Sequence, residues 1–142
     1  MLASQENNMT QTTVLPRALR ISVALHAVLI GGQVLSSGLL FGGSGIALAA
    51  HEHGAQIAQI VCLVVLALAL VLRRRGQVPR PVVIVAAILF FGEALQTALG
   101  YNHLLAIHVP LGVAIVIGNV RLLDLVFERR AAGTAAIRPV SG

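Results

Sequence analysis

The side chains of this sequence that could do chemistry are few, because most of the chain is apolar. Two histidines, His51 and His53, lie directly before a long apolar run, and His108 lies inside another one. His26 and Glu93 are the other ionisable residues well within long apolar stretches. An ionisable group inside a membrane is costly unless it is paired, so each is a candidate for metal binding, proton transfer or a structural hydrogen bond.

The composition predicts an integral membrane protein. Of the 142 residues, 57% are hydrophobic and only 11% are charged, whereas a soluble domain carries about 25% charged residues. The single cysteine, Cys62, lies in an apolar run, so we expect no disulfide framework within the chain and no cysteine-based zinc site. We interpret Cys62 as a small apolar residue of the core or the lipid face.

Four stretches are long and apolar enough to cross a hydrocarbon core, which takes roughly 20 helical residues. We expect an all-α, integral membrane up-and-down four-helix bundle over residues 18–126. Residues 1–17 and 127–142 are predicted to be a disordered N-terminal arm and a C-terminal tail. The predicted spans are 18–40, 52–72, 81–100 and 103–125.

The basic residues predict the orientation in the membrane. The loops after the first and third spans contain no arginine or lysine, and all ten basic residues of the chain are arginines on the other side. The positive-inside rule then places both termini in the cytoplasm. The use of arginine without lysine suggests a GC-rich bacterial genome, so we expect the membrane to be the bacterial inner membrane. Because topology explains the basic residues, we expect no nucleic-acid partner.

Two of the histidines predict a haem site. His53 and His108 each lie about one helical turn below the predicted outer boundary of the second and fourth spans. These spans are parallel and diagonally opposed in an up-and-down bundle, so two imidazoles could ligate a haem iron from both sides. Gly54 and Gly112 beside them leave room for a macrocycle. Residues two apart point to different faces of a helix, and we favour His53 over His51 as the ligand.

The remaining polar residues have more than one interpretation. Gln56 could hydrogen-bond the haem propionates at the outer surface. Glu93 could exchange a proton near the haem edge or orient a histidine ligand, or make a structural hydrogen bond. His26 is predicted to hydrogen-bond a helix carbonyl or Asn119, and is a weaker candidate for a metal ligand.

The two histidine segments also carry a family resemblance. "EHGAQIAQIV" and "AIHVPLGVAIVIG" resemble the openings of the second and fourth helices in one half of haem A synthase, and similar segments of small four-span bacterial membrane proteins. The resemblance implies a haem held by two histidines, carried over onto His53 and His108. The sequence departs from the synthase in having Glu52 adjacent to His53, where the family has its glutamate three residues before the histidine. The cysteine pair of the first outer loop is also missing, so the haem-oxidising activity is not implied.

We therefore predict a small membrane protein that binds one haem b and serves electron transfer or haem carriage, and that is not an enzyme by itself. Its partners would be the lipid bilayer and a respiratory or redox membrane complex, or a second copy in a homodimer. One alternative is a non-catalytic accessory subunit of a larger complex. Another is a proton-coupled transporter subunit that uses Glu93.

The predicted orientation can be tested with reporter fusions in a bacterial host. Green fluorescent protein fused after Gly142 should fluoresce, and alkaline phosphatase at the same place should be inactive, because that terminus is predicted to be cytoplasmic. Insertion of the reporters between Gly42 and Gly43 should reverse both results. Active phosphatase at the C-terminus would contradict the prediction.

Overall fold

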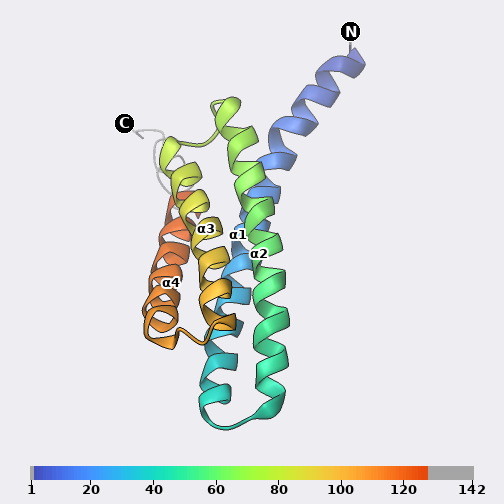
Figure 1. Ribbon diagram of the computed structural model, residues 1–142. Helices are drawn as coiled ribbons and strands as arrows, with labels where there is room; N and C mark the ends of the chain where they lie inside the picture. The colour runs from blue at the N-terminus through green and yellow to red at the C-terminus, as the bar shows by residue number, and fades with distance from the viewer. Residues whose placement is uncertain (1, 128–142) are drawn as a thin grey trace, which may run out of the picture.

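The computed structural model describes residues 2–127, with side chains from residue 14 onward, and forms an up-and-down bundle of four α-helices (Figure 1). Each helix contains a segment long and apolar enough to cross a membrane. The predicted fold class, a multi-pass bundle of four spans, is confirmed. The helices are α1 (Leu2–Phe41), α2 (Gly45–Arg74), α3 (Arg80–Tyr101) and α4 (Leu105–Phe127).

The helices form a ring in which each one packs against two neighbours. Helix α1 packs on α2 and α4, and α3 packs on the same two helices (Figure 1). The pairs α1–α3 and α2–α4 are therefore the diagonals of the bundle. At the end with the α1–α2 turn, this hairpin reaches beyond the α3–α4 turn (Figure 1). A residue of α2 that lies level with a residue of α4 is therefore further from the start of its own helix.

Tight turns of one kind separate the helices. A residue with positive φ follows each of the first three helices: Gly43, Gly76 and His103. At the first turn, Gly43 N donates to Leu40 O and Ser44 N donates to Leu39 O. This is the Schellman pattern, which satisfies the last free carbonyl groups of a helix. Such short turns make consecutive helices antiparallel neighbours.

The second helix begins earlier than the sequence predicts, at Gly45 and not at Glu52. The stretch Gly45–Ala50 lies in the predicted loop between the first two spans, but it consists mainly of alanine, leucine and isoleucine, which support a helix. Gly42, Gly43 and Ser44 are sufficient for the turn. As a result, His51 lies about 9 Å inside α2 at a rise of about 1.5 Å per residue.

Helix α1 begins at Leu2, the first described residue, and so includes most of the stretch 1–17. This stretch contains no glycine, and its only helix breaker is Pro16, which lies inside the helix. The predicted C-terminal tail lies, apart from Phe127, outside the described residues.

The core is built from apolar residues at helical spacing of three and four. On α2 this series is Ala58, Cys62, Val65, Ala69 and Leu72, all nearly or fully buried. Many other large apolar side chains are exposed on the outside of the bundle, which is where lipid would cover them.

Polar contacts add to this apolar packing. Gln59 Nε2 on α2 donates to the carbonyl of Phe90 on α3, at 3.0 Å. The amide thereby ties two neighbouring helices together inside the bundle.

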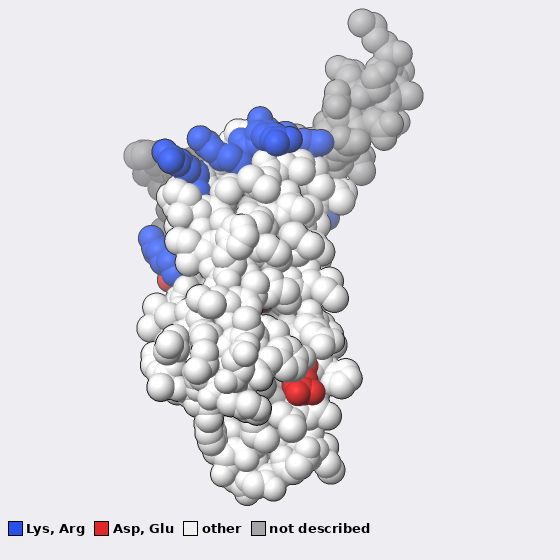
Figure 2. All heavy atoms as spheres, viewed as in Figure 1, with Lys and Arg blue, Asp and Glu red and all other residues white. Residues whose placement is uncertain are grey.

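Charge is strongly segregated along the bundle. On the face seen in Figure 2, basic side chains gather at the end with the α2–α3 turn, and none lies at the opposite end. Arg73, Arg74, Arg75 and Arg80 border this turn. The segregation supports the topological interpretation of the arginines.

Candidate functional site

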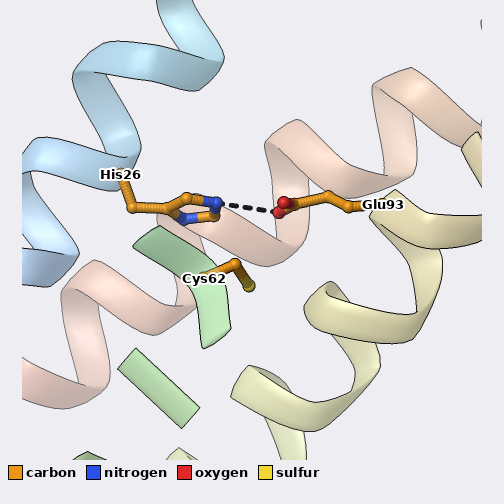
Figure 3. Close-up of side chains that lie close together, drawn as sticks. All are labelled: His26, Cys62 and Glu93. Carbon is orange, nitrogen blue, oxygen red and sulfur yellow. Dashed lines mark ion pairs between the residues drawn. The ribbon is translucent and has the colours of Figure 1, made fainter. Parts of the chain in front are cut away.

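One polar side chain from each helix meets in the centre of the bundle. His26, Cys62, Glu93 and Asn119 are 0%, 0%, 6% and 3% exposed. His26 Nε2 lies 2.8 Å from Glu93 Oε1, and Asn119 Nδ2 lies 2.6 Å from His26 Nδ1. The side chains of His26, Cys62 and Glu93 converge from three helices in Figure 3, and each offers a donor atom within 4.8 Å of the others. We call these four residues the central cluster.

The central cluster lies deep within the membrane-spanning part. Cys62 is about 25 Å along α2 from Gly45 and about 18 Å from Arg74, at about 1.5 Å per residue. Glu93 is about 20 Å along α3 from Arg80 and about 12 Å from Tyr101 by the same rise. The cluster is therefore a polar layer surrounded by apolar core above and below.

The contact between His26 and Glu93 leaves part of the central cluster without a hydrogen bond. Within the described part of the chain, His26 Nε2 and Glu93 Oε1 lie 2.8 Å apart without the geometry of a good hydrogen bond, and the buried Glu93 Oε2 has no hydrogen-bond partner. A buried polar atom without a partner is costly at such a depth.

A second polar layer lies nearer the end of the bundle that carries the α1–α2 turn. The rings of His51 on α2 and His108 on α4 face each other across the diagonal, with centroids 6.2 Å apart and ring planes at 63°. We call these two residues the outer histidine pair. The structure thus brings His51, and not His53, to His108.

Both rings of the outer histidine pair are held at Nδ1. Ser36 Oγ and Ser37 Oγ lie 3.1 and 3.3 Å from His51 Nδ1. His108 Nδ1 lies 2.9 Å from the carbonyl oxygen of Gln96 and can donate to it. Among the described residues, neither Nε2 takes part in a recorded hydrogen bond, so both remain available as donor atoms toward a metal.

Glycines beside this pair make room for polar side chains of neighbouring helices. A Cβ at Gly54 would collide with Nε2 of Gln33, and one at Gly112 would lie 3.0 Å from Nε2 of Gln96. With its amide oriented to suit its neighbours, Gln33 donates to His51 Nδ1 at 3.2 Å and to the His51 carbonyl at 2.9 Å, and accepts from Ala55 N at 3.1 Å. The space predicted for a macrocycle at Gly54 and Gly112 is thus filled by two amides.

The other predicted site residues lie elsewhere. His53 is exposed, and its Nδ1 lies 2.8 Å from the carbonyl oxygen of Ala49 on its own helix. Gln56 is exposed as well. Glu93 pairs with His26, and within residues 2–127 no ion pair joins it to a residue of the outer histidine pair. The predicted contact between His26 and Asn119 is confirmed.

The place of Cys62 in the central cluster differs from the sequence prediction, which was a small apolar residue and no zinc ligand. From Ile60 to Leu72 the helix is apolar on all sides, so periodicity there selects no inward face. One signal was available, because distance from the arginine-bearing ends places three residues at similar depth. Arg17 to His26, Cys62 to Arg73 and Arg80 to Glu93 correspond to about 14, 17 and 20 Å of helix.

Comparison with known proteins identifies no family. No protein-family model matches the chain, and no curated protein and no solved structure is significantly similar to it. The resemblance to haem A synthase is therefore supported only at the level of four long apolar helices. Fold and site define a multi-pass membrane protein with a buried group that could hold a metal.

A double-mutant cycle tests the pair at the centre. His26→Leu should lower the free energy of unfolding by about 3 kcal/mol, because it leaves the Glu93 carboxyl group buried without its partner. The double variant His26→Leu/Glu93→Leu should lose less than His26→Leu alone. Unfolding in detergent micelles measures both, with Ser22→Ala one turn away as control. Equal losses in the single and double variants would contradict the pairing.

A second double-mutant cycle tests the contact between Gly54 and the Gln33 side chain. Gly54→Ala should displace the Gln33 amide and cost roughly 1 kcal/mol of hydrogen bonding relative to Gly31→Ala, where no heavy atom lies within 4 Å of the new methyl group. In a Gln33→Ala background the two glycine substitutions should have the same effect on the unfolding temperature. A difference that survives in this background would exclude Gln33 as its cause.

Proposed function

We propose that this protein binds one haem b in the outer half of the bundle, with His51 and His108 as axial ligands. The observation that carries the proposal is the distance of 6.2 Å between the two ring centroids. Two imidazoles bound at about 2.0 Å to opposite sides of one metal ion have centroids roughly 6 Å apart. The proposal retains His108 from the sequence and replaces His53 with His51.

The hydrogen bonds at Nδ1 support this assignment. A histidine that ligates a metal almost always has its other ring nitrogen bonded to a carbonyl, a carboxylate or water, which fixes the tautomer. His108 has such a partner in the Gln96 carbonyl. His51 is held by two serines of α1, and its exposed neighbour His53 has no partner on another helix in the described chain.

The space for the macrocycle depends on Gln33 and Gln96. These two side chains fill the notches at Gly54 and Gly112, and binding requires both amides to withdraw. Glutamine has several rotatable bonds, and its amide could then bond the haem propionates. The two ring nitrogens would supply the ligands, and the cost of making room for the macrocycle would fall on these two flexible side chains.

A haem with two axial histidines has no open position on its iron, so it supplies one-electron transfer and not oxygen chemistry. We infer that the protein carries electrons or haem in a bacterial inner membrane, with the outer histidine pair on the outward side. The arginine-rich α2–α3 turn supports this orientation. A redox complex or a second copy of the chain would supply the electron partner.

Absorption spectroscopy tests the proposal. The full chain, purified in detergent from haem-supplemented cells, should show a Soret band and sharp α and β bands after reduction with dithionite. His51→Ala and His108→Ala should each abolish the low-spin spectrum, because each removes an axial ligand.

His53→Ala is the matched control, since it removes an imidazole two residues away that lies exposed on the helix. Its spectrum should equal that of the wild type. A colourless wild-type protein would exclude haem binding. Loss of the spectrum in His53→Ala and its retention in His51→Ala would exclude the ligand assignment.

A further inference from the structure

We propose that the central cluster is a second, separate site that binds a divalent transition-metal ion of the zinc type. The ligands are His26 Nε2, Cys62 Sγ and a carboxylate oxygen of Glu93. This inference does not depend on haem at the outer histidine pair, because the two sites share no residue and lie about 16 Å apart along α2.

The donor atoms suit such an ion. Zinc binds imidazole nitrogen, thiolate sulfur and carboxylate oxygen at about 2.0–2.3 Å. Tetrahedral ligands at these bond lengths lie roughly 3.3–3.8 Å apart, and the three atoms here already lie within 4.8 Å of one another. A contraction of about 1 Å, within the reach of side-chain rotation, would bring the three donors to bonding distance, and water would take the fourth tetrahedral position.

The state of the buried atoms supports the same site. Glu93 Oε2 is buried without a hydrogen-bond partner in the described chain, and the contact of 2.8 Å between Glu93 Oε1 and His26 Nε2 lacks good hydrogen-bond geometry. These are the atoms that a metal ion would satisfy.

The charges of the three ligands favour a divalent ion. Bound as thiolate and carboxylate, Cys62 and Glu93 supply two negative charges, and the neutral His26 supplies none. They cancel the two positive charges of the metal, so the loaded site carries no net charge in a medium that penalises one. Starting from a neutral empty site, binding releases two protons, one from the thiol and one shared between His26 and Glu93.

Asn119 acts as a positioning residue. Nδ1 of His26 lies 2.6 Å from the Asn119 amide, and the nitrogen and oxygen of an amide can exchange places by rotation. With the amide oxygen toward the ring, it accepts the Nδ1 proton and leaves the lone pair of Nε2 directed at the metal. This is the usual support of a ligating histidine.

Cobalt substitution tests the site with a spectroscopic signature. Cells grown with Co²⁺ in place of Zn²⁺ load the site during folding, and the full chain is purified in detergent. We expect about one Co²⁺ per chain and a near-ultraviolet band from charge transfer between thiolate and cobalt. Cys62 is the only cysteine of the chain, so such a band can arise from no other residue.

Matched variants separate ligands from structure. Cys62→Ala should abolish the band, and Glu93→Gln, which keeps the shape and removes the charge, should abolish stoichiometric binding. Asn119→Ala should keep the band but weaken metal affinity about 10- to 100-fold. His51→Ala/His108→Ala should retain the band in full, because it alters only the outer histidine pair.

The spectrum of the wild-type protein tests the metal-site proposal even if a variant fails to fold. A protein without the charge-transfer band, or with no more bound metal than Cys62→Ala, would overturn the proposal. It would leave the central cluster as a structural contact between helices. Failure of haem binding has a different signature, namely a missing Soret band with the cobalt band intact.

Discussion

The absence of water inside a bilayer is the constraint on which this structure depends. Every polar group within the spans must find its partner inside the bundle. The contact between His26 and Glu93 meets this demand across a diagonal, since α1 and α3 do not pack on each other directly. His51 and His108 face each other across the other diagonal. Polar side chains thus bridge the two pairs of helices that backbone packing leaves apart.

Apolar packing and polar bridging divide the bundle into layers. Alanine, valine and leucine at spacings of three and four hold neighbouring helices together. Between these apolar layers lie the central cluster and, nearer the end with the α1–α2 turn, the outer histidine pair. Within a bilayer the hydrophobic effect gives little preference for one helix partner over another, because lipid tails are as apolar as the side chains. The polar layers therefore help to define the register and rotation of the helices.

The two polar layers have different chemical character. The outer histidine pair offers two nitrogen donors, with the opposite ring nitrogens already engaged. The central cluster offers nitrogen, sulfur and oxygen donors and two potential negative charges. The first set suits a planar group ligated on both sides, whereas the second suits a compact cation. The layers share no residue, so one can be altered without removing a ligand of the other.

Composition and periodic spacing determined a great deal without any structure. Length and hydropathy are sufficient for four spans, because crossing a bilayer requires a certain number of apolar residues. The contact of His26 with Asn119 could also be expected, since few buried polar groups exist to satisfy one another. Only the tertiary structure decided which of His51 and His53 faces the interior. The choice depends on where α2 begins and on how far the α1–α2 hairpin reaches beyond α4, and neither is local. For the same reason the sequence gives only the depth of Cys62 and not its inward orientation, because the residues after Gln59 are apolar on every side of the helix.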